Sequence, residues 1–585
     1  MLDHKDPRSA VNVPSGGPDK DEADLEGPKA PQDPDEVPNY YLTGSKLYLI
    51  LGGIGLTVYL FALDVSVIAT AIPAITTQFN ATTDIGWYAA AYPLCLCSLQ
   101  PMSGKIYTYF SLKWSYFVFV GIFLLGSLLC AVSQNSNMFI TARAITGVGA
   151  SGIFSGALSI LAVVTPLSKR ALYTACLTGV FGIATVTGPI IGGALTTKVS
   201  WRWCFYINLP VGAFTLVALG LFFKPPIRET DKGTLREKIE KIDVIGCALF
   251  IPTIVMVLLA LQWGGHQYAW KSATVIGLFC GAAVLAAIFL TWEFKRGDDA
   301  MIPFSVVLQR SILLSCLFSA CMFGAYMINI YYMPEWFQVI KGASPLHSGV
   351  MTLPAVGSQV ASAIISGLIG SRTGYYNPWF FVGIGSMSIA SGLYTTLTTS
   401  TGHAKWITFL VFQGLGGSSF QSPLLAVQAT LASRPRLIPV GLACSAFFQY
   451  FGASVFQSIA LAIFQNQLVK SLKSRAGLDQ AQVQLILDAG SGNARKVTLD
   501  SFPNKLSSVL WAYNKAITNV FYASLAACIL GFFIATGVEW KNTKAKPASA
   551  PKSQTESEIP VTDEARETDL ITPARSEKDE ESLSS

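Results

Sequence analysis

Charge is scarce along this chain, and so is the chemistry that depends on it. Charged residues make up 13% and hydrophobic residues 51% of the 585 residues, whereas soluble domains carry about 25% charged residues. The four histidines, His4, His266, His347 and His403, lie in tails or loops. The eleven cysteines fall in or beside apolar segments and lack metal-ligand spacing. We therefore expect small core cysteines and neither a metal site nor a cofactor.

Motifs of enzymes and of ATP-driven machines are absent from the sequence as well. It has no glycine-rich loop ending in Gly-Lys-Ser/Thr, no nucleophile elbow and no metal-spaced His/Glu pair. Basic residues are spread over short loops instead of forming one patch, which speaks against nucleic acid as a partner. We expect a protein that is not an enzyme and is not driven by ATP.

Long apolar stretches make up most of the chain. A membrane helix needs about 20 predominantly apolar residues, and fourteen stretches reach that length. The fold class is therefore an all-α membrane protein with about fourteen transmembrane helices, and its surroundings are a lipid bilayer. The stretches are 47–70, 84–104, 115–133, 138–163, 171–195, 204–223, 244–263, 273–293, 311–333, 347–369, 378–398, 406–428, 438–464 and 510–536.

Loop charge predicts the orientation of these helices. An even number of spans places both termini on one side, and the short loops on that side hold most of the lysines and arginines, which predicts cytoplasmic termini. The tails, 1–45 and 541–585, are polar and are expected to be disordered. Residues 465–509 are expected to form a long external loop. The external sequence Asn80-Ala81-Thr82 is a candidate glycosylation site at Asn80.

One stretch, Gly188-Pro189-Ile190-Ile191-Gly192-Gly193, combines residues that break helices in water but are tolerated in membranes, where small residues let helices approach closely. It resembles the antiporter motif in the fifth helix of exporters of the major facilitator superfamily. Further runs resemble the fourteen-span drug:proton antiporter branch of that family, including fungal toxin and multidrug efflux pumps. These runs are 63–73, 143–149, 201–212, 414–417 with Gln421 and Pro423, and 441–449.

This resemblance implies two six-helix bundles, at 46–223 and 294–540, with a linker at 224–243 and two inserted helices at 244–293. Two similar cytoplasmic loops support the repeat, one with Gly104 and Lys113 and one with Gly367, Arg372 and Gly374. The family carries charged residues where Thr108, Leu112 and Ser371 stand here. A cytoplasmic latch made of charges is therefore in doubt in this chain.

Two charges lie well inside predicted spans, Asp64 in the first and Arg143 in the fourth. Each costs several kcal/mol in a bilayer, about 2.5–3.5 on insertion scales, and needs a reason. Both are at similar depth, so they could approach one another. One interpretation is a proton-coupling pair, in which Asp64 takes up a proton and releases Arg143. The alternative is a permanent ion pair that fixes helix packing.

Polar groups in otherwise apolar spans are candidates for the lining of a substrate cavity. They are Tyr92, Tyr326, Asn329, Gln359, Gln421 and Gln449. Each needs a hydrogen-bond partner, so interhelical hydrogen bonding is the alternative to substrate contact. Aromatic and amide groups with few charges would suit an uncharged or weakly charged amphiphile.

The sequence thus predicts a proton-coupled efflux transporter for a small amphiphilic drug or secondary metabolite, acting as a monomer in the plasma membrane. Alternatives are an importer or vacuolar transporter, for siderophores or basic amino acids, and a non-transporting sensor. By resemblance, the fifth helix would pack against the span 378–398, and the Gly188–Gly193 surface would form an external seal between the two bundles.

Overall fold

The structure consists of helices, as a chain in a bilayer must satisfy its own backbone hydrogen bonds. It is a computed structural model that describes residues 40–81, 84–225, 228, 233–265 and 267–544. These residues hold two isolated β-bridges and no strand. Most of both predicted disordered tails and part of the linker 224–243 lie outside the described residues.

The first seven helices pack chiefly on one another and are called the N-terminal bundle. Five of them are long, and the sixth apolar stretch is divided by a short turn into two helices. They are α1 (Gly44–Phe79), α2 (Ile85–Tyr109), α3 (Leu112–Val132), α4 (Ser136–Val164), α5 (Leu167–Lys198), α6 (Trp203–Tyr206) and α7 (Asn208–Phe222).

A helix pair follows and is called the inserted pair, α9 (Val244–Trp263) and α10 (Ala273–Arg296). The short helix α8 (Leu235–Lys241) precedes it, and η4 (Gly297–Asp299) and α11 (Phe304–Val307) follow it. Side-chain caps define where the pair begins. Asp243 accepts a hydrogen bond from the backbone N–H of Gly246, and Ser272 accepts one from that of Val275.

The remaining helices again pack chiefly on one another and are called the C-terminal bundle. The bundle comprises α12 (Arg310–Lys341), α13 (Pro345–Met351), α14 (Leu353–Thr373), α15 (Asn377–Tyr394), α16 (His403–Leu415), η5 (Gly416–Ser419), α17 (Gln421–Thr430), η6 (Pro435–Leu437), α18 (Ile438–Ser474), α19 (Gln480–Ser501), η7 (Pro503–Lys505) and α20 (Leu506–Thr536).

All fourteen predicted apolar stretches are helical. Within the described residues, eleven helices are long and apolar enough to cross a membrane. The other three stretches correspond to α2, to the 18-residue α15, and to α16, η5 and α17, where a 3-10 turn interrupts the helix. The structure therefore agrees with an all-α membrane protein.

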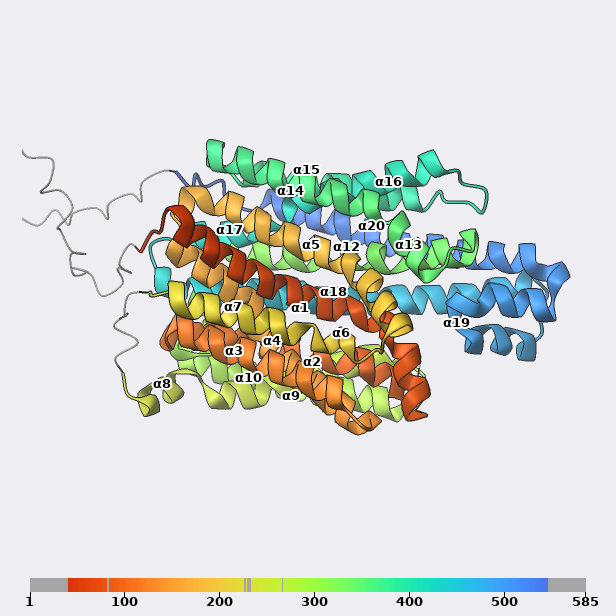
Figure 1. The fold of residues 1–585 in the computed structure, drawn as a ribbon, viewed down its shortest axis with the longest axis horizontal. Helices are drawn as coiled ribbons and strands as arrows, with labels where there is room; N and C mark the ends of the chain where they lie inside the picture. Colours follow the sequence, from red (N-terminus) through yellow and green to blue (C-terminus); the bar gives the residue numbers. More distant parts are fainter. Residues whose placement is uncertain (1–39, 82–83, 226–227, 229–232, 266, 545–585) are drawn as a thin grey trace, which may run out of the picture. The chain divides into compact units, whose positions relative to one another are not determined.

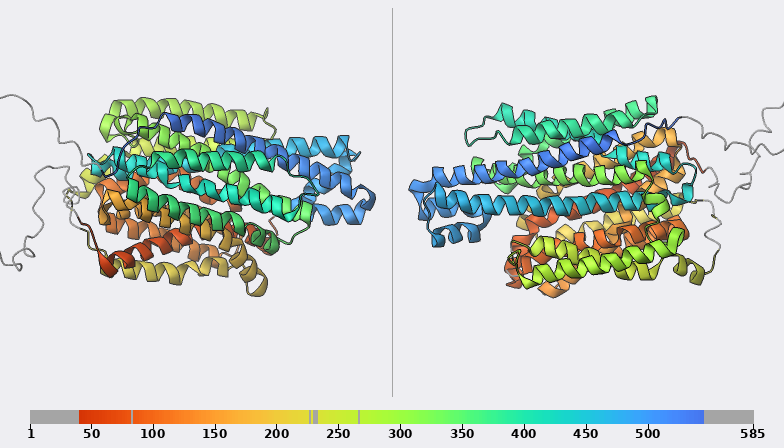
Figure 2. Two further views of the ribbon diagram at one scale, coloured as in Figure 1. Left: turned by 90° about the horizontal axis from the view of Figure 1, so that it is seen from above. Right: turned by 180° about the vertical axis from the view of Figure 1, so that it is seen from behind.

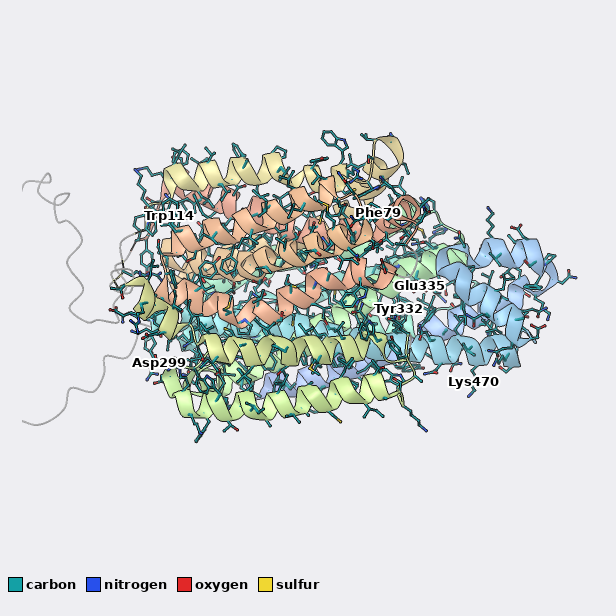
Figure 3. All side chains as sticks on the ribbon, turned by 90° about the horizontal axis from the view of Figure 1, so that it is seen from below. Phe79, Trp114, Asp299, Tyr332, Glu335 and Lys470 are labelled. Carbon is teal, nitrogen blue, oxygen red and sulfur yellow. The ribbon has the colours of Figure 1, made fainter. Side chains whose placement is uncertain are left out.

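The helices define two ends. The end at which α1 begins and α20 finishes is called the tail end, and the opposite one the far end (Figure 1). Trp114 and Asp299 lie at the tail end, whereas Phe79, the last residue of α1, lies towards the far end (Figure 3). The predicted long loop 465–509 is mostly helical, because α18 continues to Ser474 and α19 and η7 follow before α20.

Two seams join the bundles, one between α2 and α18 and one between α5 and α14. Glycines allow both close approaches. A methyl group on Gly104 would lie 2.7 Å from Cβ of Ala443 on α18, and one on Gly367 would lie 2.6 Å from Cβ of Ala175 on α5. Both glycines were predicted in loops, but they belong to α2 and α14.

The inserted pair covers only one of these seams. Helix α9 packs on α2 and α18 along one side of the molecule (Figure 2, right). The rings of Phe250 on α9 and Phe447 on α18 lie 5.3 Å apart, and Gln262 donates a hydrogen bond to the carbonyl of Gly86 near the far end. The α2–α18 seam is therefore covered, whereas the inserted pair makes no such contact along α5 and α14.

Candidate functional site

The two predicted intramembrane charges meet inside the N-terminal bundle. Nη1 of Arg143 on α4 lies 2.5 Å from Oδ2 of Asp64 on α1, and the two side chains are 1% and 0% exposed. The attraction between the two charges offsets part of the free-energy cost of removing both from water. Oδ1 of Asp64 and Nε of Arg143 have no hydrogen-bond partner among the described residues. The contact is a geometric finding, and a role in proton coupling stays a prediction.

Two aromatic rings flank the guanidinium of Arg143. Its Cζ atom lies 4.6 Å from the ring centre of Tyr92 on α2 and 5.9 Å from that of Phe205 on α6. A ring face attracts a cation, most strongly where water is excluded. Arg143 therefore has attractive neighbours besides Asp64. Tyr92, a predicted cavity residue, lies at the ion pair.

The glycine motif of α5 packs against α1, close to Asp64. A methyl group on Gly188 would lie 1.9 Å from Oγ of Ser66, and one on Gly192 would lie 2.4 Å from Oγ1 of Thr70. Ser66 also donates a hydrogen bond of 3.2 Å to the carbonyl of Ala184 on α5. The motif glycines thus bring α5 against α1 within two to six residues of the ion pair.

This arrangement corrects the predicted external seal. The cross-bundle partner of α5 is α14 and not the span 378–398, which forms α15. Gly188 and Gly192 face α1 of their own bundle, and a methyl group on Gly193 would meet no atom within 4 Å. Pro189 lies within α5 beside them. Gly188 and Gly192 thus make a contact inside one bundle, whereas Gly193 lies on another side of α5, on which no atom packs.

Seven aromatic rings form a cluster across the middle of the two bundles. Phe61 of α1 lies 6.2 Å from Tyr450 of α18, and Phe181 of α5 lies 6.3 Å from Phe323 of α12. The remaining members pack on these four. The central aromatic cluster consists of Phe61, Phe154, Phe181, Phe323, Tyr326, Phe420 and Tyr450.

Sequence reasoning singled out only Tyr326 among these rings. Phenylalanine is common in every membrane helix, so its presence alone gives no signal. The one signal that could have found the cluster is a shared depth along the helices. Four of its members lie 12 to 17 residues after the first residue of their helices, namely Phe61, Phe181, Phe323 and Tyr450.

The predicted cavity amides divide into two sets. Gln359 accepts a hydrogen bond of 3.1 Å from the hydroxyl of Tyr326 and therefore lies at the cluster. Gln421 donates to Oγ of Ser366 at 2.5 Å and accepts from Thr178 of α5 at 3.5 Å, so it bridges the bundles.

The second set lies away from these bridges. Asn329 donates to Oγ of Ser391 at 3.1 Å inside the C-terminal bundle. This bond joins two helices of one bundle, as expected if Asn329 serves interhelical hydrogen bonding and not substrate contact. Gln449 is half-buried on α18, next to Tyr450.

At the tail end, hydrogen bonds to uncharged acceptors connect the bundles. Thr108 donates to the carbonyl of Arg436 at 3.3 Å, and Nη1 of Arg170 donates to the side-chain oxygen of Gln428 at 3.4 Å. Lys113 bonds the carbonyl of Gly220 within its own bundle at 2.7 Å. Thr108 thus joins the bundles at a position where the family carries a charge.

The second predicted tail-end loop, with Gly367, Arg372 and Gly374, accepts hydrogen bonds from the segment that follows α20. Gly374, with a φ of +80°, ends α14 in the left-handed conformation, and its carbonyl accepts from the backbone of Thr543 at 2.9 Å. The carbonyl of Arg372 accepts from Lys544 at 2.6 Å. Nearby, a hydrogen bond from Lys541 holds the pKa of Glu539 below its usual value.

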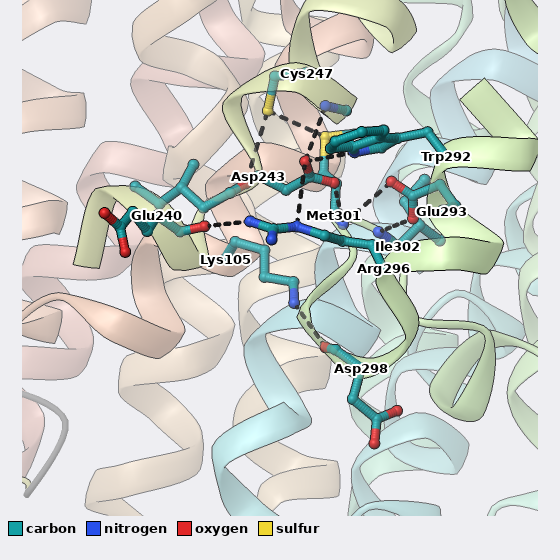
Figure 4. A network of polar contacts seen from close by, with 12 residues as sticks. Lys105, Glu240, Asp243, Cys247, Trp292, Glu293, Arg296, Asp298, Met301 and Ile302 are labelled. Atoms are coloured by element: carbon teal, nitrogen blue, oxygen red, sulfur yellow. Dashed lines mark hydrogen bonds and ion pairs between the residues drawn. The ribbon is translucent and has the colours of Figure 1, made fainter. Parts of the chain in front are cut away.

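A polar network that the sequence did not predict ties α2 to the inserted pair (Figure 4). Lys105 is 1% exposed, and its Nζ donates to the carbonyl of Asp298 at 3.2 Å. The buried carboxylates of Asp243 and Glu293 accept from the backbone N–H of Met301, each at 3.2 Å. This network fixes the segment between α10 and α12 against the N-terminal bundle.

Asn80 ends α1 at the far end with a φ of 50° and is exposed. Thr82 of its glycosylation sequence lies outside the described residues. Glycosylation there stays a prediction. In the part of the chain that the structure describes, no group of three or more His, Cys, Asp or Glu side chains could hold a metal ion.

Known proteins resemble this chain over most of its length. Residues 54–457 match the family model of the Major Facilitator Superfamily. The MFS-type transporter poxA of Penicillium oxalicum is 46% identical over 560 residues, covering 94% of this chain and 99% of that protein. The efflux pump aflT of Aspergillus parasiticus is 41% identical, covering 86% of this chain and 97% of that protein.

Two further similarities concern a second efflux pump and a solved structure. The MFS-type efflux pump MFS1 of Arthroderma benhamiae is 42% identical, over 87% of this chain and 95% of that protein. The solved proton:xylose symporter XylE aligns with a TM-score of 0.54 at 13% identity, over 86% of this chain and 97% of that chain. At this identity the symporter supports the fold alone.

Proposed function

The chain belongs to the Major Facilitator Superfamily and is a membrane transporter, and we propose that it exports a small, uncharged amphiphile in exchange for protons. The observation that carries this proposal is the buried pair of Asp64 and Arg143. It supplies one group that can take up a proton and one charge that responds to that event.

The proton acts by weakening the ion pair. While Asp64 is ionised, Arg143 holds α4 against α1. Protonation removes the charge of Asp64, and Arg143 then keeps the rings of Tyr92 and Phe205 as its attractive neighbours. Because Ser66 lies half a helical turn beyond Asp64 and contacts α5 through Gly188, a shift of α1 reaches α5 directly. The two states of the pair thereby bias the two arrangements of the bundles.

The exported molecule binds at the central aromatic cluster. Both bundles contribute rings to it, and Gln359 and Gln421 offer amides beside it. Stacked rings favour flat, apolar groups, while a few amides fix orientation. This chemistry suits a drug-like compound or a secondary metabolite better than a sugar or a phosphate.

Export is the direction we propose, with the tail end in the cytoplasm. Relatives that cover nearly the whole chain are named efflux pumps. Lys105, Lys113, Lys169 and Arg170 lie near the tail end, the distribution expected for a cytoplasmic face. The protein acts as a monomer in the plasma membrane.

Nile red, a flat and uncharged fluorescent amphiphile, provides the test. Yeast cells that lack their own drug exporters are loaded with the dye without an energy source, and glucose then restores the proton gradient. Cells with the wild-type chain release dye faster than cells with Asp64→Asn. Asp84→Asn changes a carboxylate outside the pair and should behave as wild type. Net dye uptake would contradict export, and equal release with Asp64→Asn would contradict proton coupling.

A further inference from the structure

We propose that a groove between α1 and α5 is a loading site, at which the flat apolar part of the exported amphiphile enters from the bilayer leaflet at the tail end. The inference rests on the proposed export function and adds to it a second binding site outside the central aromatic cluster. Helices α1 and α5 lie side by side (Figure 1).

The groove has the size and lining of a ligand site. Its volume is about 430 Å³, within the usual range of about 300–1,000 Å³ for small-molecule pockets. None of its lining residues is charged. They are Leu51, Gly52, Gly55, Leu56 and Tyr59 of α1, and Tyr173, Cys176, Leu177, Val180 and Ile183 of α5.

Two glycines hollow the α1 wall of this groove. Gly52 and Gly55 lie one turn apart, and a methyl group on either one would meet no atom within 4 Å. This differs from Gly188 and Gly192 of the same helix pair, whose missing side chains are required for packing. The small residues at 52 and 55 therefore leave space that no protein atom fills. Opposite them, Cys176 and Ile183 are exposed, so the groove opens towards the lipid.

The groove lies at the depth of one leaflet. Its α1 residues begin about 10 Å and end about 22 Å from the first residue of that helix, and its α5 residues span about 9–24 Å from theirs. With the tail end in the cytoplasm, the opening faces the inner leaflet. A compound dissolved in that leaflet reaches the groove without passing through water.

The groove ends within one helical turn of two members of the central aromatic cluster. Tyr59 precedes Phe61 by two residues, Leu177 precedes Phe181 by four, and the rings of Phe61 and Phe181 lie 6.1 Å apart. The hydroxyls of Tyr59 and Thr187 share a hydrogen bond of 2.9 Å that ties the two helices together beyond the groove.

The uncharged lining of the groove and its nearness to the cluster favour a flat, uncharged ring system as the occupant. Tyr59 and Tyr173 contribute aromatic rings to the two walls of the groove, and rings pack well on rings. On the opposite seam the inserted pair covers α2 and α18, so lateral access favours the side of α5. A lipid acyl chain is the competing occupant, and the experiment separates the two.

Cys176 serves as a reporter inside the groove. Of the cysteines, Cys176 and Cys280 are the two exposed ones, so Cys280→Ser leaves Cys176 as the fast-reacting thiol. The purified chain is reconstituted in liposomes without any gradient and labelled with pyrenyl maleimide, with and without Nile red. We expect the dye to slow labelling of Cys176. Labelling at the same rate would mean that lipid fills the groove and would overturn the inference.

Filling the groove gives the second readout. Gly55→Leu places a side chain in the open space, where its Cβ would meet no atom within 4 Å, and leucine suits a helix better than glycine. We expect it to abolish protection of Cys176 and to raise the KM for Nile red export about tenfold, equivalent to about 1.4 kcal/mol. Gly121→Leu is the matched control, since Gly121 on α3 also faces open space. Unchanged protection and unchanged KM in Gly55→Leu would refute the loading site.

The two proposals fail in different ways. If wild-type cells release no Nile red, the export proposal fails for this dye, while labelling of Cys176 still reports whether the dye occupies the groove. If export and its dependence on Asp64 are present but Gly55→Leu behaves as Gly121→Leu, only the loading site is wrong.

Discussion

Replacement of Gly188 by alanine is a sensitive test of how the glycine motif works. A methyl group there would lie 1.9 Å from Oγ of Ser66 and 2.8 Å from its Cβ. Since ordinary contacts begin near 3.4 Å, rotating the hydroxyl away is not enough, and α1 and α5 must separate by about 1 Å. Overpacking of this kind costs about 2 kcal/mol.

The expected loss can be measured by thermal unfolding of the purified protein, followed by tryptophan fluorescence. A cost of about 2 kcal/mol lowers Tm by about 2 °C in a chain of this size. Gly193→Ala is the control, because the same motif faces open space at that position. It should keep or raise Tm, since alanine favours a helix over glycine.

A second change separates packing from other effects of Gly188→Ala. Ser66→Gly removes both atoms that the new methyl group would meet. The double variant should recover at least about 1 kcal/mol relative to the sum of the single effects. If Gly188→Ala unfolds at the wild-type temperature, or if Ser66→Gly brings no recovery, the α1–α5 contact is not what the motif provides.

Three further substitutions test other parts of the account. Tyr92→Leu removes the ring 4.6 Å from Arg143 and should slow Nile red export up to about tenfold, whereas Tyr92→Phe should export as wild type. Lys105→Met removes the bond to the Asp298 carbonyl and should lower the stability of the purified protein by about 1–3 kcal/mol in thermal unfolding. Phe323→Leu removes the ring that contacts Phe181 of the N-terminal bundle and Tyr450 of its own bundle, and it should weaken Nile red binding about fivefold in a fluorescence titration, roughly 1 kcal/mol.

Each of these expectations has a contradicting result. Equal export by Tyr92→Leu and Tyr92→Phe would mean that the ring does not support Arg143. An unchanged unfolding temperature in Lys105→Met would mean that the network of Figure 4 does not stabilise the inserted pair. Unchanged dye binding in Phe323→Leu, with Leu125→Ala at an exposed position as a control, would place the binding site elsewhere.

The family and the fold class could be predicted from the sequence, because length, hydropathy and the order of motifs are properties of the chain itself. The match of residues 54–457 confirms the family. The depth of a residue along its helix could also be predicted from the sequence. Asp64 and Arg143 were expected at similar depths in the membrane, and the structure shows them in contact.

Helix neighbours could not be read in the same way. The pattern of Gly188–Gly193 predicts a close contact but does not name the partner, and the partner is α1 instead of the span 378–398. The central aromatic cluster could not be predicted for a related reason. Its rings come from five helices and from the junction of η5 and α17, and no local pattern marks them. Lys105 could not be recognised as buried because it follows the apolar stretch 84–104, whereas α2 continues to Tyr109.

Substrate-driven proton movement tests the central claim most directly. Liposomes containing the purified chain and a pH-sensitive dye in their lumen receive a Nile red gradient, and the lumenal pH is followed. Wild type should move protons against the flow of Nile red, and Asp64→Asn should still exchange Nile red between the two sides while moving no protons. Proton movement that persists in Asp64→Asn, or Nile red transport by wild type without any proton movement, would contradict the account.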